Sequence, residues 1–293
     1  MSFIPRQLHG IALGLLLAGP ALGQTAPPQE TTVQGVEVQD LNGGNQEVRG
    51  VEVQNLNSGS EGAQAIAAYQ ASIKRNEPAL ARARPGSPQA LELAGKLVSS
   101  YEGMGIALVQ NGECEKAIAA LGRAIELSRD VLQKEDDNAL YARSLCYTRT
   151  GRPQDSVADL ERLLQAKENL QYREELAANY ARLDRKEEAL QQYRKLLESN
   201  PNNAWWNFQA GYLYADKQDY EAAAAAYEKA IAGRGQLPET TVASAWNNLG
   251  GAYFRLCRKD EAIAAFKKAA ALNPSFSEGL GAAYLLKCPP ANP

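Results

Sequence analysis

Four cysteines are the residues whose chemistry can be read most directly from this chain. They are Cys114, Cys146, Cys257 and Cys288. Their scattered spacing is unlike that of metal-binding cysteines, so we expect no metal site. In an exported chain, four cysteines favour two disulfide bonds, and the spacing alone allows three connectivities. Four inert, buried thiols are the alternative.

The N-terminus has the pattern of a secretory signal. An apolar run at residues 11–18 is followed by small residues, Ala21 and Gly23, at the −3 and −1 positions of a cleavage site. We therefore predict a signal peptide of residues 1–23 and an exported protein, periplasmic or secreted. Pro20 stands where a lipoprotein would carry its lipid-bearing cysteine, which favours a soluble product. A retained membrane anchor is the alternative; after cleavage we expect no stable membrane insertion.

Cleavage before Gln24 would remove the single histidine, His9. A mature chain without imidazole cannot perform Ser-His-Asp or Cys-His catalysis. Acid–base chemistry would then depend on carboxylates alone. The adjacent Glu174 and Glu175 do not face one another on a helix, so they do not suggest a hydrolase. We expect a protein that is not an enzyme and that needs no cofactor.

The composition is that of an ordinary soluble helical protein. Charged residues make up 22% of the 293 residues and hydrophobic ones 45%, with a formal net charge of −3. A nucleic-acid partner would need a basic stripe, which this balance argues against. Alanine, the best helix former, is abundant, so we expect an all-α protein.

A recurring pattern of large and small residues defines the helices. It is clearest at residues 243–276, where eight positions, counted from Ala243 as position 1, carry characteristic residue types. Positions 4, 7, 8, 11, 20, 24, 27 and 32 are Trp246, Leu249, Gly250, Tyr253, Ala262, Phe266, Ala269 and Pro274. This pattern closely resembles the tetratricopeptide repeat, a pair of antiparallel helices with a period of about 34 residues.

The same frame recurs upstream. Position 8 is small in five copies, which are Gly105, Ser144, Ala177, Gly211 and Gly250. Position 24 is large in all five, which are Leu121, Leu160, Tyr193, Tyr227 and Phe266. We place repeats at 98–131, 137–169, 170–203, 204–237 and 243–276. The resemblance implies an α-solenoid, a right-handed superhelix with a concave groove.

Insertions and flanking segments complete the expected layout. We expect a longer second helix across residues 125–137 and a loop at 233–238. Residues 61–97 should form capping helices, interrupted by Pro78, Pro85 and Pro88, with one helix starting near Gln89. Residues 277–293 should form a C-terminal capping helix and tail. We expect this amphipathic helix to run from Ser275 to Lys287, with Phe276, Leu280, Ala283 and Tyr284 covering the last repeat.

Residues 24–60 form a low-complexity tail with a duplicated motif. The sequence GVEVQDLN at residues 35–42 recurs as GVEVQNLN at residues 50–57. A disordered tether is the favoured interpretation, and a hairpin is the alternative. The motif could add a strand to a partner's sheet or fill the groove of this protein.

The repeat frame selects a disulfide pairing. Cys114 occupies position 17 of one repeat and Cys146 position 10 of the next, while Cys257 occupies position 15 and Cys288 an equivalent of position 12. Each pair therefore joins the turn of one unit to the first helix of its neighbour. We predict disulfides Cys114–Cys146 and Cys257–Cys288.

The family resemblance also implies a ligand-binding face. In tetratricopeptide repeats, positions 2, 5, 6, 9, 12 and 13 of each first helix face the groove. The candidate binding residues are Tyr141, Arg149, Arg182, Trp205, Phe208, Tyr212, Asn247, Asn248 and Arg255. The family's carboxylate clamp needs Lys or Arg at position 5, and no repeat here has one, which argues against chaperone tails as partners. Packing of the aromatic residues against neighbouring helices is the alternative interpretation.

These features predict a non-catalytic adaptor in the bacterial envelope. Its groove would hold a peptide or protein segment with some acidic character. A glycan-binding accessory protein is the alternative, with Trp205 and Tyr212 stacking on sugars.

Overall fold

The computed structural model describes residues 59–287, and in this range it is all-helical with no strand, as predicted. The expected signal peptide, and the tail up to residue 58, lie outside the described residues. Two compact units divide the chain between Gln192 and Tyr193. No helix in the described range is both long enough and apolar enough to cross a membrane.

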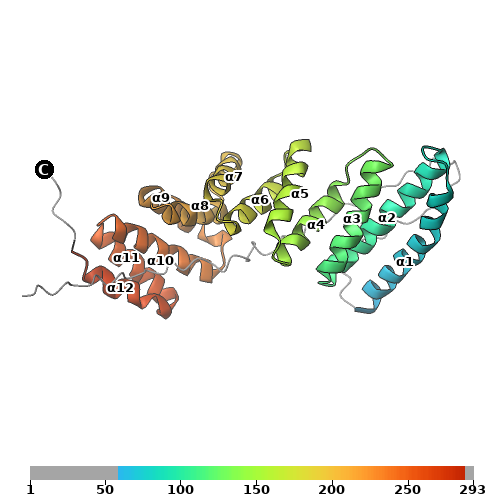
Figure 1. Ribbon diagram of the computed structural model, residues 1–293. Helices are drawn as coiled ribbons and strands as arrows, with labels where there is room; N and C mark the ends of the chain where they lie inside the picture. The colour runs from blue at the N-terminus through green and yellow to red at the C-terminus, as the bar shows by residue number, and fades with distance from the viewer. Residues whose placement is uncertain (1–58, 288–293) are drawn as a thin grey trace, which may run out of the picture. The chain divides into compact units, whose positions relative to one another are not determined.

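In each unit, neighbouring helices form antiparallel hairpins that stack side by side (Figure 1). The first unit contains α1 (Gly59–Arg82), α2 (Pro88–Gln110), α3 (Cys114–Asp130), α4 (Asp137–Arg149), α5 (Pro153–Ala166), α6 (Leu170–Arg182) and the start of α7 (Lys186–Ser199). The second contains the end of α7, α8 (Ala204–Asp216), α9 (Tyr220–Ala232), α10 (Glu239–Arg255), α11 (Lys259–Leu272) and α12 (Ser277–Tyr284).

Each hairpin closes where a small residue at position 8 meets a large one at position 24. A Cβ atom added to Gly211 would lie 2.9 Å from Tyr227 Cδ1, and one added to Gly250 would lie 2.8 Å from Phe266 Cδ1. Both aromatic side chains are fully buried. Because only a small residue leaves room for the ring, this contact brings the two helices of a repeat together.

The turn between the two helices has the same backbone conformation in all five repeats. Position 15 takes a left-handed φ in every copy, at Gly112 (78°), Gly151 (75°), Asp184 (58°), Gln218 (64°) and Cys257 (59°). The following amide donates back to the carbonyl of position 11, as Arg258 N does to Tyr253 O at 2.9 Å. This is the hydrogen bond of a Schellman C-cap, which ends the first helix and reverses the chain.

The N-terminal helices differ from the prediction in two ways. Pro78 does not end a helix, because α1 continues through it to Arg82. Pro78 is exposed, so water can hydrate the carbonyl that loses its helical partner. The predicted boundary at 97/98 is no structural break, since α2 runs without interruption from Pro88, capped by Ser87.

The insertions and the C-terminal helix also refine the prediction. Helix α3 is 17 residues long against 14 for α5 and ends at Asp130, so it falls short of the longer helix predicted across residues 125–137. The rest of that insertion is a loop, and Asp136 caps α4 from its end. Residues 233–238 form a connection with one turn of 3-10 helix, as expected of a loop.

The capping helix α12 ends at Tyr284, and Tyr284 was predicted wrongly as a covering residue. Its side chain is 51% exposed, whereas Ala283 is fully buried and Leu280 is half-buried against the core. The helix is only eight residues long, so few of its side chains reach the last repeat.

Candidate binding surface

Two tyrosines form the centre of the candidate surface in the first unit. Tyr141 of α4 and Tyr172 of α6 have ring centroids 4.9 Å apart, with planes tilted by 39°. Both side chains are half-buried, so part of each ring remains available to a ligand. Burial raises the pKa of the Tyr141 hydroxyl, and the nearby charge of Glu175 raises it further. Tyr141 was predicted as a binding residue; its ring partner Tyr172, at position 3 of its repeat, was not.

Glu175 lies near Tyr141, and few interactions offset the desolvation of its carboxylate. Desolvation raises the pKa of the Glu175 carboxyl, and Glu174 raises it further, whereas Arg182 and Arg149 lower it. The net direction is upward, so the cost of burial exceeds the attraction of the two arginines. Among the described residues, no hydrogen bond to this carboxylate is present. A ligand could therefore supply the hydrogen-bond donor that this carboxylate does not find among the described residues.

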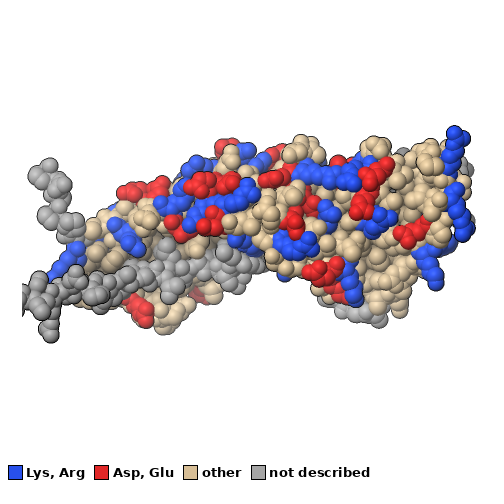
Figure 2. Space-filling model, in the orientation of Figure 1, with Lys and Arg blue, Asp and Glu red and all other residues tan. Residues whose placement is uncertain are grey.

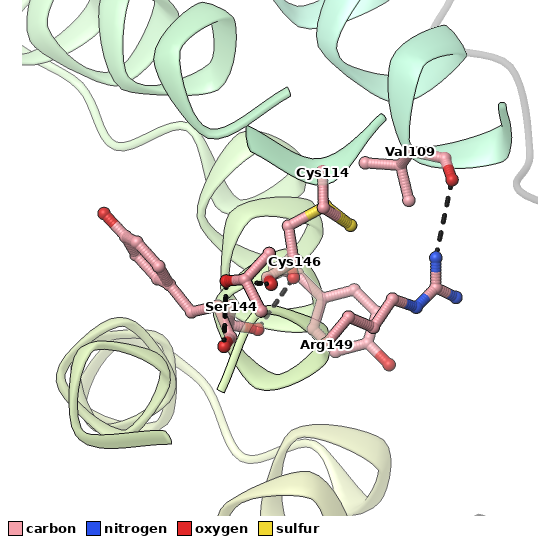
Figure 3. The surroundings of a disulfide bond; sticks show 8 residues. Val109, Cys114, Ser144, Cys146 and Arg149 are labelled. Carbon is pink, nitrogen blue, oxygen red and sulfur yellow. Dashed lines mark hydrogen bonds between the residues drawn. A yellow bond between two sulfur atoms is a disulfide. The ribbon is translucent and has the colours of Figure 1, made fainter. Parts of the chain in front are cut away.

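The guanidinium groups of the two predicted arginines in this unit each make a hydrogen bond within the protein. Arg149 is exposed and donates from Nη1 to the carbonyl of Val109 at 3.4 Å, beside the disulfide (Figure 3). Arg182 is half-buried and donates to Asn179 Oδ1, also at 3.4 Å. Both distances are long for hydrogen bonds, so these contacts are weak ones.

The disulfide between Cys114 and Cys146 is present, as predicted, with a Cα–Cα distance of 5.0 Å. It joins the start of α3 to α4, and both residues are buried. The predicted partner of Cys257, Cys288, lies outside the described residues, so that pairing stays a prediction.

In the second unit, three of the predicted binding residues are buried. Phe208 is fully buried and packs against Tyr227, with ring centroids 5.9 Å apart. Asn248 is also fully buried and donates to the Tyr227 hydroxyl at 3.4 Å, and Asn247 is 8% exposed. These residues belong to the core, so their prediction as ligand contacts is wrong in this structure. For Phe208, the alternative interpretation of aromatic packing is the correct one.

The remaining predicted residues of the second unit stay partly accessible. Trp205 and Tyr212 of α8 are half-buried, and Trp205 stacks on Phe208 with ring centroids 6.1 Å apart. Arg255 is exposed, with its guanidinium carbon 5.7 Å from the centroid of the Tyr220 ring. Part of the Trp205 side chain and part of the Tyr212 side chain therefore remain exposed on α8.

The surface as a whole carries both signs of charge. Figure 2 shows basic and acidic side chains interleaved over much of the visible face. Several ion pairs of the described residues join side chains three positions apart, such as Arg123–Glu126 and Arg258–Glu261. In the described part of the chain, no group of three or more acidic, cysteine or histidine side chains is placed to hold a metal ion.

Comparison with known proteins gives the family. Sequence models described as Tetratricopeptide repeat match residues 103–170, 175–238 and 243–276, which together are more than half of the chain. The chain belongs to the tetratricopeptide repeat family. No match was found among curated proteins.

Solved structures agree on the fold. The crystal structure of MamA protein is 21% identical with a TM-score of 0.54, and the match covers 67% of this chain and all of that one. The crystal structure of YrrB is 22% identical with a TM-score of 0.54, covering 66% of this chain and 98% of the other. At this identity the likeness establishes the fold.

Proposed function

We propose that this protein is a non-catalytic scaffold of the bacterial envelope that holds a peptide segment of a partner against its first helices. The observation that carries the proposal is the half-buried pair of Tyr141 and Tyr172 beside the desolvated Glu175. Aromatic rings next to an uncompensated polar group are typical of binding hot spots rather than of inert surface.

The family and its neighbours support the same activity. Tetratricopeptide hairpins form a rigid stack that can present side chains without rearranging. The similar structure of YrrB is described as having an unusual peptide-binding site. We infer that this chain also binds peptide, although the residues of its own surface must decide which one.

Two features support the envelope as location. Residues 1–23 have the pattern of a secretory signal. The buried bond between Cys114 and Cys146 is of the kind that forms in oxidising compartments and is rare in the cytosol. Fusion of the full chain to alkaline phosphatase, which is active only outside the cytoplasm, tests this. An inactive but intact fusion would refute export.

Peptide binding is tested with a random dodecapeptide library displayed on phage. The purified full chain should enrich peptides, and Tyr141→Ala should abolish their binding because it removes one ring of the pair. Arg129→Ala, on the exposed end of a second helix, is the control. Circular dichroism should show equal helicity for all three proteins. If enriched peptides bind the Tyr141→Ala variant as well as the wild type, this surface is not the site.

Glycan binding is the second candidate, supported by the half-exposed rings of Trp205 and Tyr212 on one helix. Aromatic faces of this kind stack on sugars as well as on peptides. Purified cell-wall saccharide that quenches tryptophan fluorescence in the wild type but not in Trp205→Ala would favour this function. Absence of quenching in the wild type would eliminate it.

A further inference from the structure

We propose that the surface formed by Tyr141, Tyr172 and Glu175 selects a lysine or arginine side chain of the bound peptide. This inference rests on the proposed peptide-binding function and names the chemistry that the site recognises. It reverses the expectation of an acidic partner, which was based on the arginines of position 13.

The first step is the geometry of the two rings. Their centroids lie 4.9 Å apart and their planes are tilted by 39°, so they form an angled pair rather than a flat stack. One ring comes from α4 and the other from α6, and both are half-buried. A cation with an apolar stem can lie against such rings, because its stem covers apolar carbon while its charge meets the electron-rich face.

The second step is the carboxylate. Glu175 is close enough to Tyr141 for its charge to act on the hydroxyl, and it lies one turn along α6 from Tyr172. It is half-buried, and no hydrogen bond within the described residues reaches it. A cationic donor from a ligand would satisfy this carboxylate and form a charge-assisted hydrogen bond.

The third step is the balance of charge around the rings. Glu174 and Glu175 both act on Tyr141, and Asp137 acts on Tyr172. On the basic side, Arg149 and Arg182 each make a hydrogen bond with the protein itself. They reduce, but do not cancel, the cost of burying Glu175. The field at the rings is therefore complementary to a positive side chain.

An acidic peptide fits the same surface poorly. Its carboxylate would have to approach Glu174 and Glu175 to reach the rings, and like charges at short range are unfavourable. The arginines would attract it only at the edge. The tyrosine pair thus discriminates between the two signs of charge, which gives the inference a direct test.

The test is the composition of the phage-displayed dodecapeptides that the full chain selects. We expect lysine and arginine to be enriched over the input library, and Glu175→Gln to lose that enrichment while still binding peptide. Glu115→Gln, on a second helix, makes the same change of net charge and should select the same peptides as the wild type. A synthetic peptide from the enriched pool should bind Glu175→Gln about tenfold more weakly by fluorescence anisotropy, the loss expected of one charge-assisted contact.

Each outcome decides a different statement. Selected peptides that are acidic or of neutral composition, or that keep their preference with Glu175→Gln, overturn the selection of a cation but leave peptide binding intact. If the full chain enriches no peptides whose binding depends on Tyr141, both this inference and the proposed function are wrong. Tyr141→Phe keeps the ring and should bind the basic peptide; loss of binding there would refute the role given to the ring face.

Discussion

The contact between Gly250 and Phe266 allows the packing rule of the repeats to be tested by adding a single methyl group. In Gly250→Ala, the new Cβ would lie 2.8 Å from Phe266 Cδ1 and 2.9 Å from both Cε1 and Cγ. Contacts this short to a rigid ring require a displacement. Gly279 of α12 approaches the same Cδ1–Cε1 edge, where an added Cβ would lie 2.5 Å from Cε1. The ring is therefore held between α10 and α12.

Two opposing terms set the magnitude. Replacing glycine by alanine inside a helix gains about 1 kcal/mol through helix propensity. Overpacking a filled core costs about 1–3 kcal/mol. Gly250→Ala should therefore change the free energy of unfolding by about 0 to −2 kcal/mol. Gly95→Ala in α2 is the matched control, because no atom lies within 4 Å of its added Cβ. It should gain the full propensity term of about 1 kcal/mol.

The assay is urea unfolding followed by circular dichroism at 222 nm. Gly250→Ala should unfold at a lower urea concentration than Gly95→Ala, with an unchanged slope. Gly250→Ala should cost less in a Phe266→Leu background than in the wild type, because the smaller side chain removes the clash. If Gly250→Ala is stabilised as much as the control, position 8 is not small for steric reasons, and the packing argument for the whole repeat is wrong.

Three further outcomes follow from other parts of the fold. Gln218→Gly should raise the free energy of unfolding by about 1 kcal/mol in urea melts, since glycine adopts a left-handed φ without strain. Gly112→Ala should lower it by a similar amount, and no change in either variant would contradict the claim that this φ is strained for other residues. Replacing Cys114 and Cys146 by serine should lower the free energy of unfolding by about 3–4 kcal/mol in urea melts, with the reduced wild type for comparison. Equal midpoints for the serine variant and the oxidised wild type would show that the disulfide adds no stability. Burial and a neighbouring glutamate raise the pKa of Tyr253 to about 12, so the folded chain keeps a proton that the unfolded chain loses near its ordinary pKa of 10.0. Stability should therefore fall between pH 10 and 12, and Tyr253→Phe should flatten that fall in melts at stepped pH.

The sequence predicted the hairpins because the sizes of the residues at a few positions determine how the two helices pack. Small residues at position 8 and large ones at position 24 predict the contact that the structure shows between Gly211 and Tyr227. The turn conformation was only partly readable. Glycine marks the left-handed residue in two repeats, but Asp184 and Gln218 adopt it as well, at a cost that their residue types do not reveal.

The binding surface was less predictable, because exposure at a given position depends on the size and placement of the side chains around it. Tyr141 and Phe208 share position 5, yet the first is half-buried and the second fully buried. Phe208 is enclosed because two rings of its own repeat, Trp205 and Tyr227, pack against it, whereas Tyr141 pairs with the half-buried ring of Tyr172 in the next repeat. The residue type at position 5 alone does not contain that information. Tyr172 was not predicted because position 3 is not among the positions expected to face a ligand.

A second regularity joins consecutive repeats and could have been read from the same frame. In the last three repeats, the tyrosine hydroxyl at position 11 meets the residue at position 25 of the preceding repeat. Tyr180 donates to Glu161 in this way, and in the next interface Arg194 donates to Tyr214 at 3.1 Å. The hydroxyl can donate or accept, so the contact persists when the partner changes from an acid to a base. In these three repeats the same tyrosine contact therefore joins neighbouring hairpins, whether its partner is acidic or basic.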